Sequence, residues 1–286
     1  MLFQAALPEM PLLLFSVLLP VGIAGSAYLS LARGFGAGED VDRKLDKLAT
    51  IPLVIAVAGL IAATFHLGKI TNIFYMVMGL GTSPLTNEIV VAGVSLAVAA
   101  VFWLVGLVKH PGRKVQRVFG IVLAILSLVL AVFVGIAYGI STVPTWDTAF
   151  SWLGEIFLVL VGGAVVATVP LGYAGAGEDR GSKLMLTCAL VGALGAIAVV
   201  YLQGVYAGGL TSSAGTDLSA LMGQYYAFAT VGSILVLLAV IVMYRDYSRA
   251  RAFERKRVTF AAILVLVGLF LIRVDFYGIY LSIGLA

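Results

Sequence analysis

The sequence predicts an all-α integral membrane protein with eight transmembrane helices. Of its 286 residues, 62% are hydrophobic and only 11% are charged, whereas an ordinary soluble domain is about a quarter charged. The apolar residues form continuous runs, and a run of about 20 such residues is long enough to cross a bilayer as a helix. Eight runs of this kind are expected near residues 11–32, 48–67, 88–109, 116–139, 152–175, 183–206, 221–244 and 258–282.

The positions of lysine and arginine predict how these helices are oriented, because both residues concentrate in cytoplasmic connections. All but two of the 18 basic residues lie in the connections after the first, third, fifth and seventh runs. Only Lys69 and Arg273 lie toward the other side. We therefore expect a multi-pass protein of the cytoplasmic membrane with both termini outside. The basic connections are expected to face anionic lipid, and no nucleic-acid partner is expected.

A repeated segment predicts that the protein is built from two four-helix halves. GAGEDVDRKL at residues 36–45 recurs as GAGEDRGSKL at 175–184, and each copy follows an apolar run of similar texture. An even number of helices in each half preserves its orientation, so the repeat is expected to be parallel. The expected halves are residues 1–140 and 141–286. The alternative is that the two connections share only turn and charge composition.

Two ionisable residues stand at neighbouring helix ends on the expected outer side. His66 closes the second apolar run and Glu88 opens the third. Antiparallel neighbours can bring both side chains to one ligand, and an imidazole beside a carboxylate can accept protons near neutral pH. An equally compatible interpretation is a histidine bonded to a loop carbonyl and a glutamate at a helix N-terminus. The residues alone leave both interpretations open.

Other polar residues collect on the same outer side, namely Glu9, Asp147, Glu155, Arg273, Asp275 and Tyr277. Arg273 and Tyr277 lie one helical turn apart and share a face. An arginine at such a position most often extends to the membrane interface or pairs with a carboxylate.

The sequence offers few ligands for a metal cofactor. A membrane b-type haem usually needs two histidines, and the only two, His66 and His110, are expected on opposite faces of the membrane. Cys188 is the only cysteine, so an iron–sulfur cluster lacks its thiolate ligands, and a zinc site lacks ligands as well. We therefore expect no haem and no metal in this protein, and electron transfer would require an acceptor in another subunit.

Four short motifs follow one another along the sequence: HLG at 66–68, NEI at 87–89, TVPTW at 142–146 and RVDFYG at 273–278. Together they resemble the membrane anchor subunits of dimethyl sulfoxide reductase, in the broader group that includes the polysulfide reductase membrane subunits. The resemblance spans the full length of the sequence and implies eight helices.

The resemblance implies a subunit that oxidises menaquinol during anaerobic respiration and anchors an iron–sulfur subunit and a molybdopterin catalytic subunit. It assigns His66 and Glu88 as the catalytic pair at the quinol site. The residues expected to contact menaquinol or menaquinone are Gly68, Asn72, Phe74, Gly81, Asn87, Arg273 and Tyr277. Asn72 stands where the family carries an arginine, so the contacts there are expected to differ. The quinol site and the docking face for the partner subunits are expected outside.

Two other function classes also fit the sequence. A secondary transporter can have parallel repeats, glycine-rich helices and few buried charges, but it is expected to carry an ionisable residue near the bilayer midplane. A purely structural anchor that binds no quinol leaves His66 and Glu88 without a role. Copurification with iron- and molybdenum-containing subunits would separate a respiratory anchor from a transporter.

Overall fold

The computed structural model describes residues 2–36, 39–66, 77–176, 180–211, 218–250 and 252–281. These ranges include eight helical segments that are long and apolar enough to cross a membrane, which confirms the predicted fold class. The segments are Leu2–Phe35, Val41–Thr64, Pro84–Lys109, Arg113–Ala137, Ala149–Ala174, Gly181–Gly208, Ser219–Arg249 and Arg255–Gly278.

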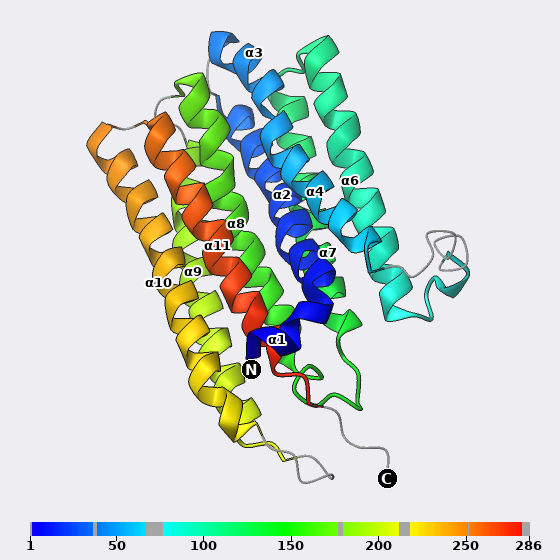
Figure 1. The fold of residues 1–286 in the computed structure, drawn as a ribbon. Coiled ribbons are helices and arrows are strands. Elements are labelled where there is room, and N and C mark those ends of the chain that lie inside the picture. The colour runs from blue at the N-terminus through cyan, green and yellow to red at the C-terminus, as the bar shows by residue number, and fades with distance from the viewer. Residues whose placement is uncertain are drawn as a thin grey trace.

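The helices pack side by side in one bundle (Figure 1). In sequence order they are α1 (Leu2–Ala6), η1 (Leu7–Glu9), α2 (Met10–Phe35), α3 (Glu39–Leu48), α4 (Thr50–Thr64), η3 (Val77–Gly79), α6 (Pro84–Lys109), α7 (Arg113–Ala137), α8 (Ala149–Ala174), α9 (Arg180–Gly208), α10 (Ser219–Ala250) and α11 (Arg255–Gly278). The short helix α1 packs against α11. The start of the chain and the end of its last helix therefore lie at the same end of the bundle.

Helices α2 and α8 form the centre of the bundle. α2 packs on α4, α7 and α8, and α8 packs in turn on α9 and α11. Most residues of the two central helices are buried. The outer helices expose large apolar side chains such as Val54, Leu104 and Leu194, which suits contact with lipid tails that are equally apolar.

Glycines let α2 approach its neighbours closely. A Cβ placed on Gly22 would lie 2.4 Å from the backbone nitrogen of Ala56 in α4, and a Cβ on Gly163 of α8 would lie 2.4 Å from the Cβ of Ala24. Small residues are common at such crossings, because membrane helices associate through van der Waals contact rather than through a hydrophobic drive. These close crossings fix the positions of α4 and α8 relative to α2, and with them the positions of the polar residues that the helices carry.

The second crossing starts earlier than the predicted segment 48–67. Residues expected in a connection form helix α3, where Leu45 is buried and Val41 and Leu48 pack against the core. α4 alone has 15 residues, which rise only about 22 Å, whereas the hydrocarbon core of a bilayer is about 30 Å thick. α3 and α4 together complete the crossing, so the predicted start of this segment is wrong.

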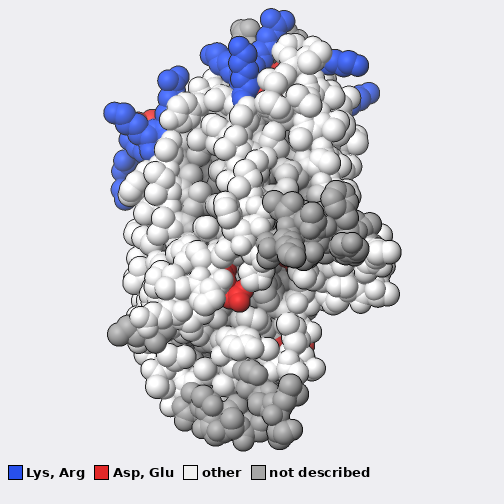
Figure 2. Space-filling view, turned by 45° about the vertical axis from the view of Figure 1, so that its right-hand side comes forward, with Lys and Arg blue, Asp and Glu red and all other residues white. Residues whose placement is uncertain are grey.

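Lysine and arginine side chains gather at one end of the bundle, opposite the end where the chain starts (Figure 2). This is the one-sided distribution seen in the sequence, and the side of the membrane that it occupies stays a prediction. The division into residues 1–140 and 141–286 also stays a prediction. The packing of α2 on α4 and α7 has its counterpart in the packing of α8 on α9 and α11.

We expect Gly22→Val to lower the free energy of unfolding by about 1–3 kcal/mol, the usual cost of overpacking. The added side chain meets the backbone of α4 at Ala56, which cannot move without separating two packed helices. Gly93→Val is the matched control, because a Cβ at Gly93 meets nothing within 4 Å. Unfolding of the detergent-solubilised variants measures the difference, and equal losses at both positions would contradict a close crossing at Gly22.

Candidate functional site

A buried ion pair joins α8 to α11 near the end of the bundle where the chain starts. Nη2 of Arg273 lies 2.9 Å from Oε1 of Glu155, and both side chains are almost fully enclosed. Nε of Arg273 donates a hydrogen bond of 3.1 Å to Oγ of Ser16 in α2. Charges tolerate such burial only as a pair, because a lone charge in an apolar interior is strongly destabilising. These contacts therefore hold α2, α8 and α11 together.

Glu88 brings a second carboxylate to this pair from α6. The residue is only 3% exposed, and its charge interacts with the charges of Glu155 and Arg273. The cluster thus contains two carboxylates and one guanidinium in apolar surroundings. One guanidinium balances only one negative charge, so the second carboxyl group is well suited to take up and release a proton.

Aromatic side chains line the same cluster. The guanidinium of Arg273 lies 4.1 Å from the ring centroid of Phe276, and the ring of Trp146 stacks on Phe276 at 5.5 Å. The indole Nε1 of Trp146 donates a 2.8 Å hydrogen bond to the backbone oxygen of Phe276, and the hydroxyls of Tyr138 and Tyr277 are 2.6 Å apart. The TVPTW and RVDFYG motifs, more than a hundred residues apart in the sequence, therefore meet in one wall of the site.

His66 lies outside this buried cluster. It follows the end of α4, its side chain is 43% exposed, and its Nδ1 is 3.9 Å from Oε2 of Glu9. Among the described residues, the acidic partner of His66 is thus Glu9 and not Glu88. Whether His66 and Glu88 share one ligand stays a prediction, and Glu9 is an additional acidic residue at the same place.

The residues before Glu88 shape the entrance to α6. The backbone nitrogen of Gly81 donates a 2.7 Å hydrogen bond to Oδ1 of Asn87, and Gly81 has a φ of +83°, a conformation that favours glycine. Oγ of Ser83 accepts from the backbone nitrogen of Thr86 and caps the helix. Gly81 and Asn87 therefore bond to each other and position the first turns of α6. Three further predicted contact residues lie outside the described residues: Gly68, Asn72 and Phe74.

Three of the predicted site residues, Glu88, Arg273 and Tyr277, lie together in the buried cluster. Glu155 and Tyr138 complete it and are not among the predicted site residues. The signal for Glu155 is a carboxylate inside an apolar helix, which is costly and therefore suggests a function. Tyr138 has no comparable signal, because the local sequence does not indicate which tyrosine hydroxyl will contact a residue of another helix.

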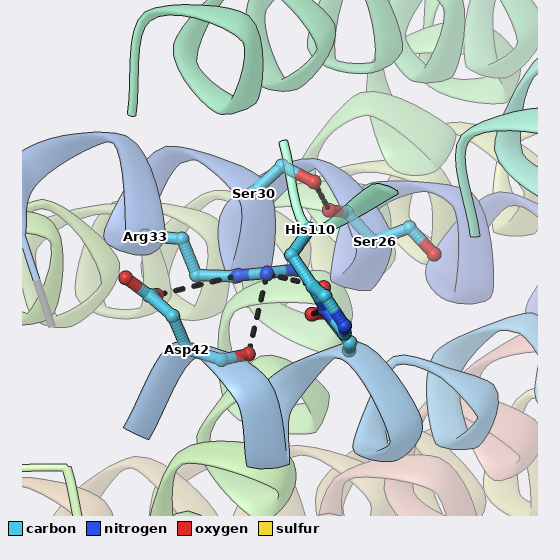
Figure 3. A network of polar contacts seen from close by, with 6 residues as sticks. Ser26, Ser30, Arg33, Asp42 and His110 are labelled. Atoms are coloured by element: carbon cyan, nitrogen blue, oxygen red, sulfur yellow. Dashed lines mark hydrogen bonds and ion pairs between the residues drawn. The ribbon is translucent and has the colours of Figure 1, made fainter. Parts of the chain in front are cut away.

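A second polar network lies at the basic end of the bundle (Figure 3). Arg33, near the end of α2, forms an ion pair with Asp46, and its Nη2 donates a 3.3 Å hydrogen bond to the backbone oxygen of Asp42. Oδ2 of Asp46 lies 2.5 Å from Nδ1 of His110, the residue that caps α6 with a φ of +46°. Beside it, Oγ of Ser30 donates to the backbone oxygen of Ser26 within α2. The network ties the ends of α2 and α6 to α3.

This network also places the two histidines. His110 contacts Asp46 in α3, where the second crossing starts, whereas His66 follows α4, where that crossing ends. They lie at opposite ends of one crossing, as the sequence predicts. In the described ranges, no group of three or more His, Cys, Asp or Glu side chains is placed to hold a metal ion.

The fold and the site define a multi-pass helical membrane protein with acidic, basic and aromatic residues buried together at one end of its bundle. Intramembrane charges of this kind mark sites that handle protons or polar ligands. The family model of the DMSO reductase anchor subunit (DmsC) matches residues 3–279, and the chain belongs to this family. The resemblance found in the sequence is thereby confirmed.

Similar proteins match the sequence from end to end. The anaerobic dimethyl sulfoxide reductase chain YnfH of Escherichia coli (strain K12) is 27% identical in an alignment of length 283 that covers 97% of each of the two proteins. A second anaerobic dimethyl sulfoxide reductase chain from the same strain is 26% identical over 97% of each protein. An anaerobic dimethyl sulfoxide reductase chain from Haemophilus influenzae is 24% identical, over 99% of the present protein and 98% of the relative.

We expect Arg273→Met to lower the free energy of unfolding by about 3–5 kcal/mol, because it leaves the buried carboxylate of Glu155 without a counter-charge. The double variant Arg273→Met/Glu155→Leu removes both charges and should recover much of this loss. Thermal unfolding in detergent measures the single variants and the double variant. A double variant that is less stable than Arg273→Met would contradict a direct pairing of the two side chains.

Proposed function

We propose that this protein is the menaquinol-oxidising membrane anchor subunit of an anaerobic respiratory complex of the DMSO reductase type. In this proposal it passes electrons to an iron–sulfur subunit, which delivers them to a molybdopterin catalytic subunit. Membership of the anchor family supports this function, and relatives of full length are chains of anaerobic dimethyl sulfoxide reductases. The observation that carries the proposal is the enclosure of Glu88 beside Glu155 and Arg273.

Oxidation of a quinol releases two protons and two electrons, so the site needs proton acceptors. Glu88 is one, because it shares a single guanidinium with another carboxylate. His66 is the other, because its exposed imidazole beside Glu9 can hand a proton to water. The two electrons leave to the iron–sulfur subunit. Menaquinol enters from the lipid near α4 and α6, whose ends carry these two side chains.

The other proposed contact residues shape the place where the quinol head group binds. Gly81 and Asn87 set the turn that leads into α6, and Arg273 and Tyr277 form the inner wall behind Glu88. Gly68, Asn72 and Phe74 belong to the connection between α4 and α6 and are proposed to cover the head group. The same connection is proposed to take part in docking the iron–sulfur subunit.

The proposed orientation places the quinol site at the outer end of the bundle and the basic end in the cytoplasm. The accumulation of lysine and arginine at the opposite end supports it (Figure 2). Protons released at the site then leave to the outside, where the electrons are also consumed. Turnover in this arrangement moves no net charge across the membrane.

We expect His66→Asn and Glu88→Gln to abolish quinol-dependent reduction by the assembled complex, because each removes a proton acceptor. Reduction driven by a dye that feeds the iron–sulfur subunit directly should continue. His110→Asn is the matched control for the histidine, because it lies at the other end of the bundle and asparagine tolerates its positive φ. Unchanged quinol-dependent activity in both site variants would overturn the assignment.

The orientation is tested with single cysteines in a Cys188→Ala background. Lys256→Cys at the start of α11 should react with a membrane-impermeant thiol reagent only after the membrane is opened. Asp147→Cys, at an exposed position before α8, should react in intact cells. The reverse pattern would show that the basic end faces outside.

A further inference from the structure

A polar stripe runs along the otherwise apolar helix α8 toward Glu155. Thr148 stands at the N-cap position of α8, Ser151 lies in its first turn, and Glu155 lies one turn further. The spacing of three and four residues puts the three side chains on one face of the helix. Asp147, directly before the stripe, is exposed. The stripe therefore connects the buried carboxylate to the surface at the end of the bundle where the chain starts.

Several buried polar atoms in this stripe and in the turn just before it lack a hydrogen-bond partner within the described part of the protein. They are Oγ1 of Thr145, Oγ1 of Thr148 and both carboxylate oxygens of Glu155. Arg273 provides an ion pair to Glu155, but no donor of good hydrogen-bond geometry among the described residues reaches either oxygen. Buried polar groups in folded proteins are nearly always paired, and exceptions often have a functional reason. Here the unpaired atoms lie at the start of α8 and at Glu155, and between them Oγ of Ser151 donates a hydrogen bond to the backbone oxygen of Trp146.

Glu155 shares the positive charge of Arg273 with Glu88. The ionisable groups that face it are Arg273 and Tyr277 of α11, and the charge of Glu88 reaches the same place from α6. Tyr138 closes the cluster behind Tyr277. Whichever carboxyl group holds the proton, the other carboxylate balances Arg273. The total charge of the cluster is therefore the same before and after the transfer, so this step adds no uncompensated buried charge.

We propose that Glu155 is a proton relay that takes the proton from Glu88 and passes it along the Thr148–Ser151 face of α8 to the outer surface. This inference rests on the proposed quinol oxidation. One quinol gives one quinone, two electrons that leave to the iron–sulfur subunit, and two protons. One proton leaves through His66. The other protonates the Glu88 carboxylate, moves to Glu155 and is released to water, which returns both carboxylates to their starting state.

The test uses the complete complex in membranes with a soluble menaquinol analogue. Glu155→Gln should lower kcat by about a hundredfold, the lower end of the range that general acid–base groups contribute, with little change in KM. Its remaining activity should rise with buffer concentration, because small buffer molecules then carry the proton, whereas the parental complex should show no such rise. Glu155→Asp keeps the carboxyl group and should retain most of the activity. Glu254→Gln, an exposed carboxylate at the basic end, is the matched control.

The outcomes separate the relay from the quinol site itself. If Glu155→Gln keeps full quinol-dependent activity while Glu88→Gln loses it, the relay is overturned and the quinol-site assignment is retained. A rise in KM, or loss of quenching of a fluorescent quinol analogue, in Glu155→Gln overturns the relay in favour of a binding role. The relay is also overturned if Glu155→Gln and Glu155→Asp lower kcat equally and neither activity rises with buffer concentration. Unchanged activity in both His66→Asn and Glu88→Gln overturns the quinol site.

Discussion

The ion pair between Arg273 and Glu155 is the interaction on which the organisation of this protein most depends. It is made from the first third of α8 and the last turns of α11, and the bond to Ser16 adds the central helix α2. Removing either partner would leave a charge inside the bundle, so the pair favours the arrangement in which these three helices meet. The guanidinium of Arg273 also packs on Phe276 of the aromatic wall, and its charge acts on Glu88.

The two ends of the bundle use buried arginine differently. At the basic end, Arg33 reaches two aspartates of α3, and a half-exposed histidine closes the network. The contacts of Arg33 join the consecutive helices α2 and α3, and the contact of Asp46 with His110 adds the end of α6, next to solvent. At the other end, Arg273 is enclosed by helices that are distant in sequence. A secondary transporter is expected to place such charges near the bilayer midplane, whereas Glu88 and Arg273 lie within a few turns of their helix ends.

Much of the fold could be predicted from the sequence, because long apolar runs and one-sided basic residues are local signals. The start of the second crossing could not, since α3 is rich in charged residues and packs into the bundle through the buried Leu45 and through Asp46, which contacts Arg33 and His110. In the site, Glu88, Arg273 and Tyr277 could be predicted because they lie in recognisable sequence motifs. The pairing of His66 with Glu9 and of Arg273 with Glu155 depends on which faces of separate helices meet, and periodicity carries no information on that.

The sequence separation of Glu88 and Arg273 has a consequence for how the protein is made. The two residues are 185 positions apart (273 − 88), and at 5–20 residues per second the ribosome needs about 10–40 s to cover that interval. During this time the first helices are already in the membrane, while the cation that both carboxylates share has not been synthesised. Insertion of the final helix is therefore the step that completes the acidic interior. A polypeptide that stops before it therefore lacks the guanidinium that pairs with Glu155 and balances the charge of these carboxyl groups.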